Sequence, residues 1–328
     1  MKRILSLIAT MLILVLVGCN SDGSDSGQQK VIKLAHSGSE SHQYHIAAEK
    51  FKEIPESNED VNFKVDIHPN ASLGSEGDVI EQVMNGSVEM TTVAGDSNLT
   101  NTIPEMNVFG IPYLFDTKEE VYNALDGEGG KELLELAEAK NMHGLGYWEV
   151  GFRHLTNDKR EIINPKDVEN MKIRVQPAAV WEEHIKSLGA SPTPVDFNEL
   201  YSALDQGVID GEENPLPTID SMKFYEVQKF ISLTAHNYTP AVTLLNKSFY
   251  DGLDDVEKDA VNQAFEEAKN YQRDVLDDKE DEIITKLEEN GVSISEPNRK
   301  AFKEATKNVK EAVSKEVSEE IINKLTQK

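Results

Sequence analysis

Short apolar runs of the strand type alternate with helical segments along most of the chain. Strand-like runs at 31–35, 63–69 and 89–95 are followed by segments with helical spacing or by turns, and the same order returns after residue 142. Strands that alternate with helices in this way are typical of an α/β fold, in which helices cover both faces of a mostly parallel sheet. Because such sheets bind ligands beyond the carboxyl ends of their strands, we expect a site at that edge.

The last third of the chain has a different pattern. Two strand-like runs, 229–236 and 241–247, precede a segment from Val256 to Glu289 in which apolar residues recur at helical spacing. The segment is long for a globular helix, but its heptad pattern is not sustained as in a coiled-coil arm. We therefore expect one long helix that crosses two lobes, followed by a second helix at 300–324 on the C-terminal lobe.

The beginning of the chain is typical of a bacterial signal peptide. A positively charged start precedes an apolar stretch at 4–17 that is too short to span a bilayer. The stretch ends in LVGC, which resembles a lipobox with Cys19 as the lipid acceptor, and a segment rich in Ser, Asp and Gly follows. We expect residues 1–18 to be the signal peptide and 19–30 the lipidated cysteine with a flexible tether; a core cysteine is the alternative.

Composition excludes several classes of function. The chain has 59 Asp and Glu against 33 Lys and Arg, a net charge of -26, whereas nucleic acids and anionic membrane surfaces need a basic partner. Cys19 is the only cysteine, so the mature chain can form no internal disulfide, thiolate zinc site or cysteine nucleophile. Dinucleotide, P-loop, serine-hydrolase and HExxH motifs do not occur in the sequence. We therefore expect no enzyme, no cofactor, no metal and no nucleic-acid partner.

Recognition chemistry is better represented. Three of the six arginines, Arg153, Arg160 and Arg174, lie within 22 residues, two of them in strand-like apolar surroundings. A buried arginine needs an anion, and its planar fork of donors matches a carboxylate. Asn214 and Phe197 each lie beside prolines where they could face the same crevice. The residues alone support a ligand carboxylate and an internal ion pair about equally.

A more specific pattern lies between residues 147 and 229. The segments YWEVGFRHLTN, NPKDVENMKIRVQP, LGASPTPVDFNELYSALDQGVIDGEENPL and FYEVQKF closely resemble the solute-binding component of TRAP (tripartite ATP-independent periplasmic) transporters, the DctP family. The resemblance covers nearly all of the mature chain. It implies a two-lobed, periplasmic-binding-protein-like (Venus flytrap) fold with crossing hinge strands and a long helix that spans both lobes. Residues 31–150 plus 242–278 would form lobe I, and 151–241 plus 279–328 lobe II.

The resemblance also implies the ligand-binding residues. Arg174 takes the position of the family's carboxylate-clamping arginine, and Arg153 that of its second arginine. Glu76 matches an acidic position that varies with the ligand, whereas Arg160 matches no ligand position. The implied ligand-binding set is Arg174, Arg153, Asn214, Phe197, Glu76, Glu149, Trp148, His36 and Ser37.

The implied function is the capture of a small organic carboxylate by an extracytoplasmic, lipid-anchored protein. Its partners would be the small and large integral-membrane subunits of a TRAP permease, which an ion gradient drives. The family's sialic-acid binders carry a glutamate where this chain has VAG at 93–95, so sialic acid is disfavoured. The segment TAHNYTPA at 234–241 and Glu149 favour a hydroxyl-rich ligand, and we expect a sugar acid such as a hexuronate.

Two alternatives stay open at this point. A C4-dicarboxylate would need a second cation in lobe I, for which Lys33 and Lys64 are candidates. A secreted enzyme that acts on acidic sugars is less favoured, and would need a base such as His36 or His154.

Overall fold

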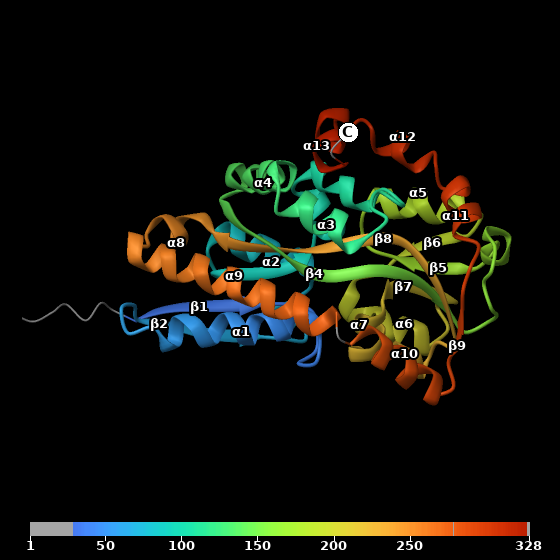
Figure 1. The fold of residues 1–328 in the computed structure, drawn as a ribbon, viewed down its shortest axis with the longest axis horizontal. Coiled ribbons are helices and arrows are strands. Elements are labelled where there is room, and N and C mark those ends of the chain that lie inside the picture. Colours follow the sequence, from blue (N-terminus) through green and yellow to red (C-terminus); the bar gives the residue numbers. More distant parts are fainter. Residues whose placement is uncertain (1–28, 278, 327–328) are drawn as a thin grey trace, which may run out of the picture.

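One mixed sheet runs through the computed structural model, which describes residues 29–277 and 279–326 (Figure 1). The strand order is β2-β1-β3-β8-β4-β7-β5-β6, and β9 pairs with β8. The strands are β1 Lys30–Ala35, β2 Phe63–His68, β3 Met90–Ala94, β4 Met142–Asn157, β5 Lys172–Val175, β6 Ser191–Pro194, β7 Gly211–Pro215, β8 Phe230–Asn246 and β9 Ser293–Ser295. The expected α/β class is confirmed.

Two long antiparallel strands, β4 and β8, connect the two ends of the molecule. Figure 1 shows β1, β2 and α1 towards one end and β5, β6 and β7 towards the other, with β4 and β8 running between them. Strand β3 pairs with the last part of β8, and β7 pairs with the last part of β4. The β4–β8 register shifts between Glu149 and Gly151, where Gly151 has φ +124°, a region that favours glycine. Beyond this irregularity, the side chains of β4 point to the opposite faces of the sheet from those that strict alternation would give.

Helices cover both faces of this sheet. The α-helices are α1 Gln43–Ser57, α2 Glu76–Asn85, α3 Lys118–Leu125, α4 Glu128–Glu135, α5 Ala179–Ser187, α6 Leu200–Asp205, α7 Leu216–Ser221, α8 Lys247–Asp251, α9 Asp255–Asp277, α10 Glu280–Glu289, α11 Arg299–Ala305, α12 Val309–Val313 and α13 Glu319–Thr326. Short 3₁₀ helices are η1 Asn98–Asn101, η2 Pro104–Gly110, η3 Leu136–Lys140, η4 Pro165–Val168, η5 Phe197–Glu199 and η6 Phe224–Glu226.

The prediction of a single long helix from Val256 to Glu289 is wrong, because two helices occupy this segment. It is divided into α9 and α10, which pack on different parts of the molecule: α9 on α1 and β4, and α10 on α7. Ala264 and Ala268 of α9 belong to one hydrophobic cluster, whereas Leu287 of α10 belongs to another. One straight helix could not bury both faces, and the junction sequence is rich in aspartate, which has a low helix propensity.

The single helix expected at 300–324 is also wrong. Three short helices occupy this region: α11 packs on β8, α12 on α5, and α13 on α3 and α4. Because each helix packs on a different partner, the segment does not form one continuous helix. The boundary that assigns all of 279–328 to lobe II stays a prediction. Helix α13 of this segment also contacts α3 and α4, which lie within 31–150.

The expected signal peptide at 1–18, Cys19 and nearly all of the tether lie outside the described residues. Within 29–277 and 279–326, no helix combines the length and the apolar character that crossing a membrane would require.

Candidate functional site

A small buried cavity lies where the carboxyl ends of several strands converge. Ser37 follows β1, Ala94 ends β3, Gln176 follows β5 and Asn214 lies near the end of β7, so strands from both ends of the sheet contribute. The space between its walls, counted out into the solvent at its mouth, is about 300 Å³. The lining residues are Ser37, His42, Tyr44, Glu76, Ala94, Ser97, Val150, Arg153, Arg174, Gln176, Phe197, Asn214 and Thr218. The position agrees with the strand edge expected from the alternating pattern.

Arg174, in strand β5, is a buried cation whose terminal nitrogens have no partner in the described part of the chain. Its side chain is 1% exposed, and its Nε donates to the carbonyl of Val195 at 2.9 Å. No hydrogen bond or ion pair engages Nη1 or Nη2 among residues 29–277 and 279–326. Burial lowers the pKa of Arg174, and the charge of Glu213 only partly opposes this effect. The site therefore holds a desolvated positive charge with two donor groups free for an anion.

Arg153, in contrast, has a protein partner on each of its three nitrogens. Its Nε forms an ion pair with Glu213, and its Nη2 donates to Glu213 Oε1 and to Asn214 Oδ1, each at 3.1 Å. Its Nη1 donates to Thr239 Oγ1 at 3.2 Å, and the guanidinium lies 5.2 Å from the centre of the Trp181 ring. Burial alone would lower the pKa of Arg153, but the charge of Glu213 raises it. Arg153 therefore orders the wall of the cavity.

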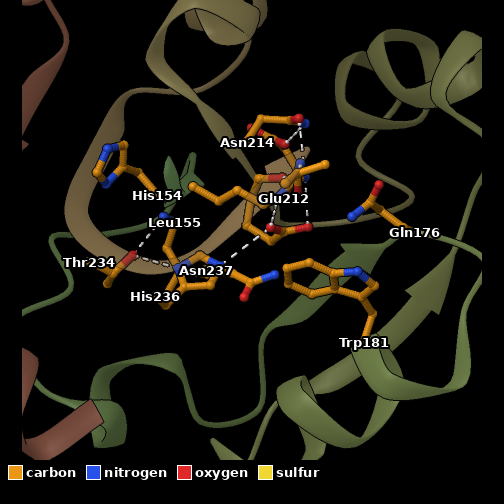
Figure 2. A network of polar contacts seen from close by, with 12 residues as sticks. His154, Leu155, Gln176, Trp181, Glu212, Asn214, Thr234, His236 and Asn237 are labelled. Atoms are coloured by element: carbon orange, nitrogen blue, oxygen red, sulfur yellow. Dashed lines mark hydrogen bonds and ion pairs between the residues drawn. The ribbon is translucent and has the colours of Figure 1, made fainter. Parts of the chain in front are cut away.

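The consecutive residues 212–214 of β7 connect this ion pair to the cavity. Figure 2 shows Glu212 and Asn214 close to one another. Glu212 accepts from Thr156 Oγ1 at 3.0 Å and from Asn214 Nδ2 at 2.5 Å, so the Asn214 amide is held at both ends. Burial raises the pKa of Glu212 to about 7. Burial would also raise the pKa of Glu213, but Arg153 outweighs it and lowers that pKa to about 2. The orientation of Asn214 is thus fixed before any ligand enters.

Glu76, at the start of α2, places hydrogen-bond acceptors in the cavity. Its Oε1 accepts from Ser37 Oγ at 3.2 Å and from the backbone nitrogen of Ala94 at 3.4 Å. Burial raises the pKa of Glu76, and these hydrogen bonds oppose the rise. Glu76 and Arg174 line the same cavity, so a ligand would meet both the guanidinium of Arg174 and the carboxyl group of Glu76.

Asp96, which sequence reasoning missed, joins three elements next to the cavity. Its side chain accepts from Thr239 Oγ1 at 2.6 Å, from Asn237 Nδ2 at 3.2 Å and from Gln176 Nε2 at 3.2 Å. Its backbone oxygen accepts from the Trp181 indole at 2.9 Å. Burial raises the pKa of Asp96 to about 7. The loop after β3 is therefore tied to β5, α5 and β8 through one residue, which orients Gln176.

The structure brings six of the nine expected ligand-binding residues to the cavity wall. These are Arg174, Arg153, Asn214, Phe197, Glu76 and Ser37.

Trp148, Glu149 and His36 do not line the cavity, and their placement does not support direct ligand contact. Trp148 stacks on Phe265 in the core with ring centres 5.7 Å apart. Glu149 accepts from the Tyr122 hydroxyl at 2.5 Å, and His36 Nε2 lies 3.1 Å from His45 Nδ1. Of β4, Val150 and Arg153 line the cavity, and they share that side because the register shifts between Glu149 and Gly151.

The candidates for the alternative functions also lie elsewhere. Lys33 Nζ donates to the carbonyl of Ser87 at 2.7 Å, and Lys64 Nζ pairs with Asp66 at 2.7 Å on the surface. His154 is buried, and its Nδ1 accepts from the backbone nitrogen of Ala235 at 3.1 Å. None of these residues lines the cavity.

Several cavity residues were missed. Gln176 follows Arg174 by two positions, so strand alternation could have placed both on one face. The other missed residues lie in strands, loops and the first turns of helices, where no local pattern marks them: His42, Tyr44, Ala94, Ser97, Val150 and Thr218.

Comparison with known proteins gives one family throughout. The model of the bacterial extracellular solute-binding protein family 7, DctP, matches residues 34–316. The 2,3-diketo-L-gulonate-binding periplasmic protein YiaO of Escherichia coli strain K12 is 33% identical over 296 residues, which cover 90% of this chain and 90% of that protein.

Two solved structures with bound sugar acids are also similar. The sugar acid binding protein DctPAm of Advenella mimigardefordensis, in complex with galactonate, is 34% identical with a TM-score of 0.88, over 92% of this chain and 97% of that one. A TRAP periplasmic solute-binding protein of Polaromonas sp. JS666, bound to D-erythronate, is 34% identical with a TM-score of 0.87, over 90% and 98% of the two chains.

Proposed function

Because the chain belongs to the bacterial extracellular solute-binding protein family 7, the DctP family of TRAP transporters, we propose that it captures a sugar-acid anion outside the cytoplasm for uptake. The observation that carries the proposal is the buried guanidinium of Arg174, whose two terminal nitrogens have no partner among the described residues. Such a group is stabilised by a bidentate carboxylate. The small and large membrane subunits of a TRAP permease would receive the ligand and use an ion gradient to transport it.

The charges in the cavity favour a monocarboxylate with hydroxyl groups over a C4-dicarboxylate. Arg153 is engaged by Glu213, so among the described lining residues Arg174 is the guanidinium whose two terminal nitrogens have no protein partner. A second ligand carboxylate would instead meet Glu76 at close quarters. Uncharged polar side chains such as Ser97 and Gln176 suit ligand hydroxyls.

The contacts of Glu149 and of the 234–241 segment remove two earlier arguments for a hydroxyl-rich ligand. Glu149 binds Tyr122, and the Thr239 and Asn237 side chains bind Asp96. The preference for a sugar acid therefore rests on the cavity itself and on the similarity to proteins that bind galactonate and D-erythronate. The C4-dicarboxylate stays the alternative.

Calorimetry with D-glucuronate, D-galacturonate, D-galactonate and succinate tests the choice of ligand class. We expect at least one sugar acid to bind at least about tenfold more tightly than succinate, a difference of about 1.4 kcal/mol. The physical reason is that succinate brings a second charge without a free cation and offers no hydroxyl hydrogen to Glu76. Tighter binding of succinate than of every sugar acid would favour the dicarboxylate alternative.

We further propose that Cys19 carries the lipid that holds the protein at the membrane, on the basis of the LVGC sequence after the apolar stretch. Cys19→Ser is expected to release the protein into the soluble fraction, because the acyl chains supply the membrane affinity. The purified variant should bind ligand with unchanged affinity, since the cavity lies in the folded part of the chain. Fractionation of cells that express each form measures this, and a Cys19→Ser protein that stays on membranes would refute the anchor.

A further inference from the structure

The hydroxyl oxygen of Thr218 accepts a hydrogen bond from Gln43. Thr218 lies in α7 and lines the cavity, with 1% of its surface exposed. Gln43 Nε2 lies 2.7 Å from Thr218 Oγ1 and 3.1 Å from the carbonyl oxygen of Val150. A carbonyl oxygen can only accept, so Val150 determines which end of the Gln43 amide carries the hydrogens. Gln43 therefore donates one hydrogen to Val150 and the other to Thr218.

A second donor, His42, approaches the same oxygen. His42 Nε2 lies 3.4 Å from Thr218 Oγ1. His42 Nδ1 accepts from the backbone nitrogen of Tyr44 at 3.2 Å, so this nitrogen carries no hydrogen. Burial lowers the pKa of His42 well below its usual value, which keeps the ring neutral. The one ring hydrogen must then be on Nε2, which donates to Thr218.

A hydroxyl oxygen has two lone pairs and one hydrogen. Both lone pairs of Thr218 Oγ1 are engaged, and no atom of residues 29–277 or 279–326 accepts its hydrogen. We infer that Thr218 is an obligate hydrogen-bond donor to the bound ligand, and that it selects ligands with an acceptor oxygen at this position. The inference rests on the proposed function and adds a rule about which sugar acids fit.

The other polar residues of the cavity show which ligand groups fit beside Thr218. Ser37 donates its hydroxyl hydrogen to Glu76, so these two residues present acceptor atoms to the ligand. Arg174 and Thr218 present donors. A polyhydroxylated acid satisfies both kinds of group, because each hydroxyl both donates and accepts. An alkyl carboxylate such as butyrate satisfies Arg174 alone and leaves the hydrogen of Thr218 without a partner, which is unfavourable in a buried site.

Thr218→Val tests the inference, because valine keeps the shape of threonine and removes the hydroxyl. We expect the affinity for D-galactonate or D-glucuronate, measured by calorimetry, to fall by roughly 10- to 100-fold. Thr218→Ser keeps both the donor and the acceptor, and its affinity should stay within about threefold of wild type. Because valine also leaves Gln43 and His42 without their acceptor, thermal unfolding without ligand is measured in parallel. If Thr218→Val fails to fold, Thr218→Ala replaces it, since the smaller side chain leaves room for water beside Gln43 and His42.

Butyrate, measured by competition, separates ligand selection from a purely structural role. We expect Thr218→Val to weaken the sugar acid and to leave butyrate nearly unchanged, so that the ratio of their affinities falls. Loss of both affinities by one common factor, or wild-type affinity for the sugar acid in Thr218→Val, would overturn the inference alone. Wild-type protein that binds neither sugar acid would overturn the proposed function and this inference with it.

Discussion

Arg174→Met is expected to weaken sugar-acid binding by about 2–5 kcal/mol, because it removes a buried, charge-assisted contact made by two donors. Arg174→Lys should lose part of this energy: the charge stays, but a single ammonium group cannot reproduce the planar fork. Without ligand, Arg174→Met should be at least as stable as wild type. Arg174 is 1% exposed and its terminal nitrogens have no partner among the described residues, so its charge is poorly compensated without ligand.

Calorimetry with one sugar acid, together with denaturant unfolding, measures both effects. Arg160→Lys is the matched control, since Arg160 lies on the surface, donates to the backbone oxygen of Asp167 at 2.9 Å and does not line the cavity. It should change neither affinity nor stability by more than about 0.5 kcal/mol. Wild-type affinity in a folded Arg174→Lys would show that the fork is not what binds the carboxylate. A large loss of stability in unliganded Arg174→Met would show that the charge is compensated internally.

The sequence predicts the α/β class well, because strands and helices alternate regularly. It predicts helix ends less well where contacts with distant residues determine them. Alternating strands and helices gave the α/β class, and the two runs at 229–236 and 241–247 belong to one strand, β8. The division of the long helix could not be seen, because helical spacing continues through the junction while α9 and α10 contact different partners. The same holds for α11–α13, whose directions are set by the surfaces on which they lie.

For the site, residue chemistry identified Arg153 and Arg174, but not that only Arg153 has protein partners for its terminal nitrogens within residues 29–277 and 279–326. Arg153 and Arg174 both lie in apolar strands, and no local pattern distinguishes the arginine that Glu213 engages from the one whose terminal nitrogens have no protein partner in the described part of the chain. Trp148 packs on Phe265 in the core and Glu149 binds Tyr122, contacts with distant residues that the local sequence does not show. An irregularity in β4 then brings Val150 and Arg153 to the same side. Such an irregularity depends on pairing with β8, a strand about 90 residues later in the chain, as the pairing of Gly151 with Thr239 shows.

Glu213→Gln is expected to destabilise the unliganded protein by about 3–5 kcal/mol, because it leaves the buried charge of Arg153 without its counterion. Both side chains are almost completely buried, 2% exposed for Arg153 and 0% for Glu213, so solvent offers little compensation. His236, whose Nε2 lies 3.3 Å from Glu213 Oε2, loses its partner as well. Glu183→Gln is the control: Glu183 forms an exposed pair with Lys186 at 3.0 Å, and its loss should barely change the stability.

Acid titration of wild type and Glu213→Gln tests whether the ion pair between Arg153 and Glu213 stabilises the protein. Arg153 lowers the pKa of Glu213 from 4.5 to about 2, so its stabilising contribution is complete above the unfolded value and is lost as the pH falls from about 4.5 towards 2. Wild type should therefore lose stability over this range more steeply than Glu213→Gln, and their free energies of unfolding should converge at low pH. Combining Glu213→Gln with Arg153→Met should recover part of the loss, since the unpaired charge is then gone. Curves that stay parallel down to pH 2, or a Glu213→Gln protein within 1 kcal/mol of wild type at neutral pH, would show that this ion pair does not hold the wall of the cavity in place.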